Sequence, residues 1–154
     1  EEHQTILSDD RITTFFARDT QNHSTGREVW QQWLDTLSQL EGPIHLSIDI
    51  DGLDGSIVPA TGTPVPGGLS YWQVVETIEA LFKAQKAIVI SADVNEIVPQ
   101  QDSPLTQFTA AMLTTKIVAH HINAKESGRW NSLTQQNGKN RMIGTSKFFQ
   151  EEGN

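Results

Sequence analysis

The sequence predicts a three-layer α/β/α fold with a mostly parallel sheet. Short apolar runs typical of strands alternate along the chain with longer segments whose apolar residues recur at helical spacing. The run at 87–91 (AIVIS) is continuously apolar, as expected for a strand covered on both faces. Strands and helices that alternate in this way form parallel sheets through right-handed crossovers. The length of 154 residues suits one domain with a sizeable core.

The first half of the chain begins with one predicted strand and one predicted helix. The strand covers 12–17 (ITTFFA), a short run of β-branched and aromatic residues. The helix covers 28–40, where apolar residues recur at helical spacing, and the Gly-Pro pair at 42–43 ends it. Its two tryptophans, Trp30 and Trp33, are therefore predicted to pack in the core.

Two further strands, 44–50 and 87–91, enclose a second helix. Ser70 followed by Gln73 has the pattern of a capping box, which predicts that the helix begins there. The apolar positions at helical spacing in this helix are expected to be buried; they are Val74, Val75, Ile78, Leu81 and Phe82.

A third helix is predicted over 105–123. Ser103 is its predicted N-cap and Pro104 its first helical residue. From residue 125 the pattern fades into a polar segment rich in Gly, Asn and Gln. We therefore predict that the domain ends at 124 and that 125–154 is a polar tail, either loosely ordered or an arm that contacts another subunit.

Composition excludes several classes of function. The net charge of −8 argues against nucleic acid as a partner. The absence of cysteine excludes disulfides, thiolate metal sites and cysteine nucleophiles. No apolar stretch approaches the length of a membrane helix, so a cytoplasmic protein is expected. The chain begins with Glu1 rather than a methionine, which suggests that it starts within a longer protein.

Carboxylates follow two of the predicted strands. Asp49 and Asp51 stand at the end of the strand 44–50, and side chains two apart on a strand point the same way. Asp93 and Glu96 follow the run 87–91, so all four would meet at the carboxyl edge of a parallel sheet. Such hard oxygen ligands suit Mg, Mn or Ca.

Two metal-dependent alternatives fit the aspartates less well. The spacing is not that of an EF-hand calcium loop, because the fifth position counted from Asp49 is Leu53 and the twelfth is Ala60. A Mg-dependent phosphatase of the haloacid-dehalogenase type also carries Asp-x-Asp after a strand, with the first Asp as nucleophile. That family, however, expects Thr or Val where this chain has Leu53. Asp54 is interpreted as a turn-forming residue.

Two longer motifs carry a resemblance to a known family. The segment 47–71 (SIDIDGLDGSIVPATGTPVPGGLSY) and the segment 91–99 (SADVNEIVP) together resemble the ureohydrolases, which include arginases and agmatinases. The similarity runs over most of 11–123, and the PATGTP sequence looks closer to arginase than to agmatinase. The resemblance implies an arginase-like fold in which residues 1–124 are the C-terminal portion of the catalytic domain.

The resemblance also implies roles for single residues. Asp49 and Asp51 would be ligands of a centre of two Mn²⁺ ions. Glu96 would be the catalytic residue that pairs with the guanidinium group of the substrate, and Thr63 would line the substrate cavity. Asp93 would support the site from behind the metal ligands. The implied reaction is hydrolysis of a small guanidino compound. The first candidate is L-arginine, which would give L-ornithine and urea; agmatine or another guanidino substrate is the alternative. The resemblance further implies a homotrimer or homohexamer.

One part of the family pattern is missing. Ureohydrolases take further metal ligands from an upstream His and an Asp-x-His-x-Asp segment, and this chain contains no such segment. Gly55 also replaces the usual Pro, and Val98 replaces a common Asn, which leaves the subfamily open. The isolated chain is therefore expected to be incomplete and inactive. A non-catalytic fragment or interaction subunit is the alternative from another class.

Overall fold

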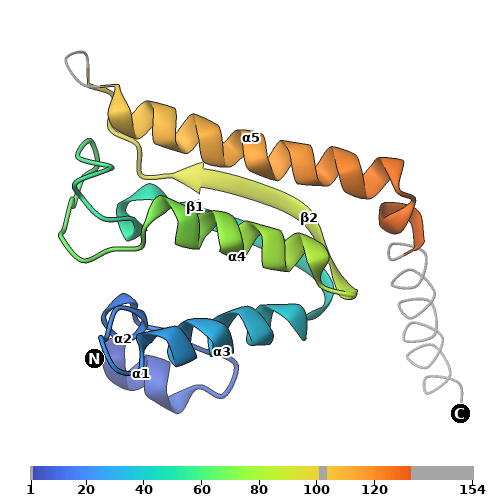
Figure 1. The fold of residues 1–154 in the computed structure, drawn as a ribbon, viewed down its shortest axis with the longest axis horizontal. Coiled ribbons are helices and arrows are strands. Elements are labelled where there is room, and N and C mark those ends of the chain that lie inside the picture. The colour runs from blue at the N-terminus through green and yellow to red at the C-terminus, as the bar shows by residue number, and fades with distance from the viewer. Residues whose placement is uncertain (1, 101–103, 133–154) are drawn as a thin grey trace, which may run out of the picture.

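The computed structural model describes residues 2–100 and 104–132. Its elements, in chain order, are α1 (Glu2–Ser8), α2 (Ala17–Thr20), α3 (Gly26–Ser38), β1 (Glu41–Asp49), the 3₁₀ turn η1 (Ile50–Gly52), α4 (Tyr71–Lys83), β2 (Lys86–Asn95) and α5 (Leu105–Glu126). In Figure 1, α4 and α5 run along the strands, and α3 lies beside α4 on the side away from α5.

The two strands pair in parallel, which confirms the predicted α/β class. The register runs from Glu41 opposite Lys86 to Asp49 opposite Asn95. It shifts by one residue after the pair of Ile44 and Val89, because β2 contains one extra residue there. Each strand is longer than predicted, and both end together at the edge where the carboxylates were expected.

The helices α4 and α5 supply most of the core. Side chains of β1 alternate between buried and exposed, with Leu46 and Ile48 buried and Ser47 and Asp49 exposed. The buried cluster joins residues of both strands, of α3, α4 and α5, and of the loop after β1; it includes Leu37, Leu46, Ile48, Ile50, Leu53, Val74, Ile78, Leu81, Val89, Leu113 and Ile117. The opposite side of β1 is thus a polar, exposed surface among the described residues.

The helix α4 begins and packs as predicted. The Ser70 side chain accepts a hydrogen bond from the Gln73 amide (3.2 Å), and the Gln73 side chain accepts one from the Ser70 amide (2.9 Å). These two bonds satisfy amides that the first helical turn leaves without partners. All five apolar positions predicted to be buried in this helix are buried.

The helix α3 lies two residues N-terminal to its predicted range and packs on α4. Trp30 and Trp33 are half-buried, and each indole nitrogen donates a hydrogen bond to α4. The acceptors are Glu76 Oε2 at 2.6 Å and Thr77 Oγ1 at 3.0 Å. The tryptophans therefore combine apolar packing with polar links between the two helices.

The predicted strand at 12–17 is wrong. Residues 12–16 form neither helix nor strand, and Ala17 begins α2. A β-branched and aromatic run becomes a strand only beside a partner, and the sheet in the described part of the chain consists of β1 and β2. Phe15 instead packs against Trp33, with ring centroids 5.3 Å apart.

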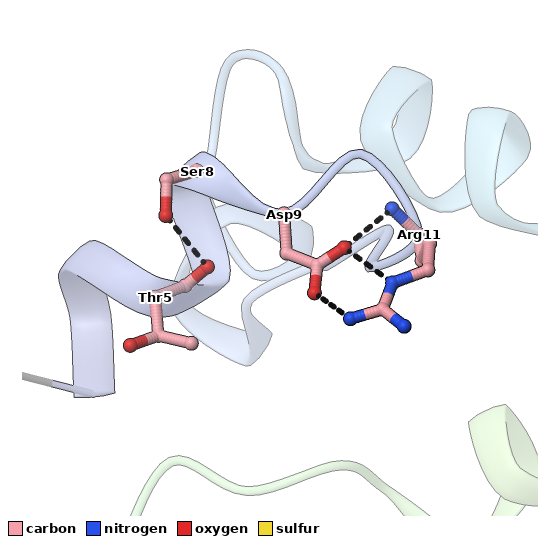
Figure 2. A network of polar contacts seen from close by, with 4 residues as sticks. All are labelled: Thr5, Ser8, Asp9 and Arg11. Atoms are coloured by element: carbon pink, nitrogen blue, oxygen red, sulfur yellow. Dashed lines mark hydrogen bonds and ion pairs between the residues drawn. The ribbon is translucent and has the colours of Figure 1, made fainter.

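The helix α1, which was not predicted, ends in a small polar network. Figure 2 shows the Ser8 hydroxyl hydrogen-bonded to the Thr5 carbonyl and the Asp9 carboxylate hydrogen-bonded to Arg11. Arg11 donates from its backbone amide (3.0 Å), its Nε (2.9 Å) and its Nη2 (2.6 Å). The Arg11 side chain, followed by the Arg11 amide, holds the pKa of Asp9 below its usual value.

The helix α5 extends past the predicted domain boundary. It begins after Pro104, which is the N-cap rather than the first helical residue, and it continues to Glu126. Ser103, the predicted N-cap, lies outside the described residues, as does the tail from 133 to 154. After α5, Arg129 donates hydrogen bonds to the carbonyls of Ala84 and Ala87, so the chain beyond 124 contacts the start of β2. No helix in the described ranges is long and apolar enough to cross a membrane.

Candidate metal and substrate site

The two predicted metal ligands lie on different local structures. Asp49 is the last residue of β1 and is exposed. Asp51 lies in the 3₁₀ turn and is half-buried. The argument that both side chains follow one strand's alternation is therefore wrong for Asp51, because the chain leaves the strand before reaching it. The turn places Asp51 at the entrance to the loop 53–69.

This loop closes back on the end of the turn. Leu53 and Leu69 form an isolated parallel bridge. The Leu69 amide donates to the Gly52 carbonyl, and the Asp54 amide donates to the Leu69 carbonyl, both at 3.0 Å. A Cβ atom on Gly68 would lie 2.4 Å from the backbone of Leu53, so only glycine permits this approach. The two ends of the loop are thus fixed beside Asp51.

Asp54 holds the loop in shape, as the sequence predicted. Its carboxylate accepts hydrogen bonds from the Ser56 hydroxyl, from the Ser56 amide (2.9 Å) and from the Gly67 amide (2.7 Å). These bonds, the one from the Ser56 hydroxyl first, lower the pKa of Asp54. The carboxylate is engaged within its own loop, as in an Asx turn.

Thr63 meets one of the predicted metal ligands directly. Its hydroxyl donates a hydrogen bond of 2.7 Å to Oδ2 of Asp51. The PATGTP segment of the loop is thereby connected to the turn that carries Asp51. Of the carboxylate residues singled out by the sequence, Asp51 is the one that this segment contacts by a side-chain hydrogen bond.

Asp93 lies on the exposed surface of the two strands, two register pairs before the last pair, Asp49 and Asn95. Its Oδ1 accepts hydrogen bonds from the Ser47 hydroxyl (2.8 Å) and from the Asn95 side chain (2.6 Å). Its Oδ2 lies 3.0 Å from Nε2 of His45. Donation by Ser47 is the main cause that lowers the pKa of Asp93, with smaller contributions from Asn95 and His45. Asp93 therefore connects Ser47 and His45 of β1 with Asn95 of β2.

Glu96 has an unusual backbone conformation. It follows the last residue of β2 and has φ of +64°, the left-handed region that non-glycine residues rarely adopt. The preceding residue, Asn95, is opposite Asp49 in the register, so Glu96 and Asp49 reach the same edge of the sheet. Residues in such conformations are typical of functional sites, where the surroundings impose them.

The segment after Glu96 is tied to the PATGTP loop and to α5. The Val98 amide donates to the Ala60 carbonyl, and the Ala60 amide donates to Oγ1 of Thr106, each at 2.9 Å. Thr106 is fully buried in the first turn of α5. Loop, β2 end and α5 therefore form one connected support for the edge where the predicted site residues lie.

Sequence reasoning missed three of the residues that organise this edge, namely His45, Asn95 and Thr106. His45 is exposed on β1 and paired with Asp93. Asn95 and Asp93 stand two apart on β2, an alternation that the sequence displays. The cross-strand partners follow only from the register.

The oxygen atoms of the predicted ligands are of the chemical type that binds hard divalent ions. Asp49 and Asp51 offer carboxylate oxygens, the ligands that Mn²⁺ and Mg²⁺ prefer. Within residues 2–100 and 104–132, however, His, Cys, Asp and Glu form no group of three or more that could hold a metal ion. The described part of the chain thus brings suitable ligands to one edge without enclosing an ion by itself.

Comparisons with known proteins agree on one family. The arginase-family sequence model matches residues 1–120. N(1)-aminopropylagmatine ureohydrolase of Thermus thermophilus is 41% identical over 91 residues, which are 59% of this chain and 29% of that protein. Arginase-1 of Bos taurus is 33% identical over 110 residues, which are 71% of this chain and 34% of that protein.

Solved structures agree with the sequence relatives. An arginase from Bacillus subtilis subsp. subtilis str. 168 superposes with a TM-score of 0.58 at 30% identity, covering 76% of this chain and 40% of that chain. In the two sequence alignments given above, the chain spans 29–34% of the length of the curated relatives. Motifs, parallel fold and family match coincide over the same residues, and the chain belongs to the arginase family of ureohydrolases.

Proposed function

We propose that this chain supplies the C-terminal portion of a manganese-dependent ureohydrolase that cleaves a guanidino compound into urea and an amine. The proposal is supported by the chain positions of Asp49, Asp51 and Glu96, which lie at or just after the carboxyl ends of two paired parallel strands in a member of the arginase family. The edge formed by such strand ends is where open α/β folds bind their ligands.

Each residue has a distinct task in this proposal. Asp49 and Asp51 would hold the two Mn²⁺ ions together with ligands from outside the described residues. Such a metal pair, when bound, generates a nucleophile at neutral pH by lowering the pKa of a water molecule. The Glu96 carboxylate pairs with the planar guanidinium group through charge-assisted hydrogen bonds. Thr63 keeps the Asp51 carboxylate oriented through its hydroxyl.

L-arginine is the first substrate that we propose. The PATGTP segment, which resembles that of arginases, favours it. A guanidino amine is the second candidate, favoured by the 41% identity with N(1)-aminopropylagmatine ureohydrolase. The two differ at the end of the substrate away from the guanidinium group, so the same three carboxylates serve either.

The test measures urea release by the full-length protein that contains this chain. Arginine and agmatine are supplied side by side, with Mn²⁺ and after chelation. We expect release that depends on Mn²⁺, loss of both metal and activity in Asp51→Ala, and loss of activity with metal retained in Glu96→Gln. Asp35→Asn and Glu28→Gln, two exposed carboxylates of α3, are the matched controls.

Three results would contradict the proposal. Normal Mn²⁺ binding and turnover in Asp51→Ala would remove the metal assignment. Absence of urea release from every guanidino compound would favour the non-catalytic alternative, and phosphate release from phosphoesters would favour a phosphatase. The predicted assembly into trimers or hexamers and the predicted cytoplasmic location stay predictions.

A further inference from the structure

A row of polar side chains crosses from β1 to β2 on the exposed surface of the sheet. We call it the cross-strand ladder; its members are His45, Ser47, Ser91, Asp93 and Asn95. His45 lies opposite Ser91 and Ser47 lies opposite Asp93 in the register. Side chains of directly opposed residues meet on one face of a sheet, and such pairs stabilise its register.

The contacts of the ladder form a continuous chain. His45 Nδ1 lies 2.8 Å from the Ser91 hydroxyl, and its Nε2 lies 3.0 Å from Asp93. Asp93 then accepts from Ser47 and from Asn95. The Asn95 side chain also donates to the Ser47 hydroxyl at 3.4 Å, so it bridges the two strands.

The ladder ends beside the two predicted site residues at the sheet edge. Asn95 is opposite Asp49 in the register and directly precedes Glu96. Glu96 keeps a left-handed φ of +64°, which a non-glycine residue holds only where its neighbours impose it. On its C-terminal side the segment is anchored by the hydrogen bond from Val98 to Ala60. On its N-terminal side the corresponding anchor is the Asn95 carboxamide.

We propose that the cross-strand ladder positions Glu96 relative to Asp49, with Asn95 as the positioning residue through which it acts. The inference rests on the proposed function, because positioning matters for a carboxylate that must meet a guanidinium group. A displacement of about 1 Å in such a group is enough to weaken substrate binding and catalysis.

The same two strands provide a matched control at their opposite ends. Lys86 Nζ lies 2.5 Å from Glu41 Oε1, and these residues are also opposite one another in the register. Glu41→Gln therefore removes the negative charge of a cross-strand ion pair far from Glu96. A ladder that only stabilised the sheet would behave like this pair.

The experiment compares Asn95→Leu, His45→Gln and Glu41→Gln in the full-length protein. Leucine has nearly the size of asparagine without its amide, and the Asn95 side chain is exposed, so we expect the fold to be retained. Four quantities are measured: steady-state kcat, KM, the Mn²⁺ affinity without substrate, and hydrogen–deuterium exchange of the segment 93–99. The exchange measurement does not depend on activity.

We expect Asn95→Leu to raise KM about tenfold, the size typical of a lost hydrogen bond to a charged partner, and to accelerate exchange in 93–99 by a similar factor. His45→Gln, which acts through Asp93, should give about a threefold effect. Mn²⁺ affinity should change less than twofold in each variant, and Glu41→Gln should leave KM and the exchange of 93–99 unchanged.

The outcomes separate the two proposals. An active wild-type protein in which Asn95→Leu and Glu41→Gln behave alike, in KM and in exchange, overturns the positioning role and leaves the ureohydrolase intact. A wild-type protein that releases no urea overturns the proposed function itself. The role of the ladder in positioning a catalytic Glu96 then falls with it.

Discussion

The Thr63 hydroxyl donates a hydrogen bond of 2.7 Å to Oδ2 of Asp51. This bond joins a loop residue to an aspartate in the 3₁₀ turn that follows β1. A hydroxyl donor to one oxygen of a carboxylate favours one orientation of the group. In metal sites, partners of this kind are nearly as important as the ligands themselves.

Replacement of Thr63 tests this relationship. Thr63→Val keeps the shape of the side chain and removes the hydroxyl, so Asp51 loses its donor. We expect the Mn²⁺ affinity of the full-length protein to fall about tenfold, the lower end of the range for such partners. Metal competition titration measures the affinity. Thr36→Val is the control, because the Thr36 hydroxyl bonds to the Gln32 carbonyl of its own helix. Equal affinities for all three proteins would contradict the assignment.

Glycine at position 68 is required by the closure of the loop. A Cβ atom there would lie 2.4 Å from the Leu53 carbonyl carbon, whereas a Cβ atom on Gly62 would meet nothing within 4 Å. We expect Gly68→Ala to lower the free energy of unfolding by about 1–3 kcal/mol, as overpacking does, and to displace the loop from Asp51. Gly62→Ala should have little effect. Denaturant unfolding monitored by tryptophan fluorescence measures both variants, and equal stabilities would show that the loop closes differently.

The parts of the fold that sequence patterns predicted are those governed by local interactions. Ser70 and Gln73 are three residues apart, and their reciprocal hydrogen bonds depend only on the helix that they begin. The apolar periodicity of α4 likewise specified which side chains are buried. The predictions that failed concern residues whose structure depends on contacts with distant parts of the chain. The run 12–16 has strand composition without strand structure, and Asp51 leaves β1 because the chain turns at Ile50.

For the candidate site, sequence patterns name residues but do not specify their contacts. Asp49, Asp51 and Glu96 were named from motifs, and the parallel register brings Asp49 and Glu96 to one edge. The links from His45 and Ser47 to Asp93 cross between strands that are distant in sequence. They depend on a register that shifts after Ile44, and no local pattern specifies that shift.

Leu113 anchors α5 in the core. Its side chain is 0% exposed, whereas that of its neighbour Met112 is 52% exposed on the same helix. Leu113→Ala should lower the free energy of unfolding by about 2–5 kcal/mol, because it removes buried methyl groups and leaves a cavity. Met112→Ala should change it by less than about 0.5 kcal/mol. Thermal and denaturant unfolding of the two variants measure the difference, and similar losses would place α5 in a different orientation.

His120 makes stability depend on pH. It is half-buried on α5 and stacks on Phe82 with centroids 5.4 Å apart. Burial is the main cause that lowers its pKa below the ordinary value of 6.5; nearby lysines add to this, and Glu79 opposes it. The unfolded chain therefore takes up a proton at this residue at a higher pH than the folded chain does. The free energy of unfolding should fall as the pH drops below 6.5 and stop falling below the folded pKa.

This pH dependence can be assigned by substitution. His120→Gln removes the titrating group, so the variant should lose less stability than the wild type between pH 7.5 and pH 5. His23→Gln, at an exposed position before α3, is the control and should retain the wild-type slope. Denaturant unfolding midpoints at several pH values measure the slopes. Equal slopes in the three proteins would mean that the His120 imidazole has the same pKa in the folded and the unfolded chain. The packing against Phe82 would then not shield the imidazole from water.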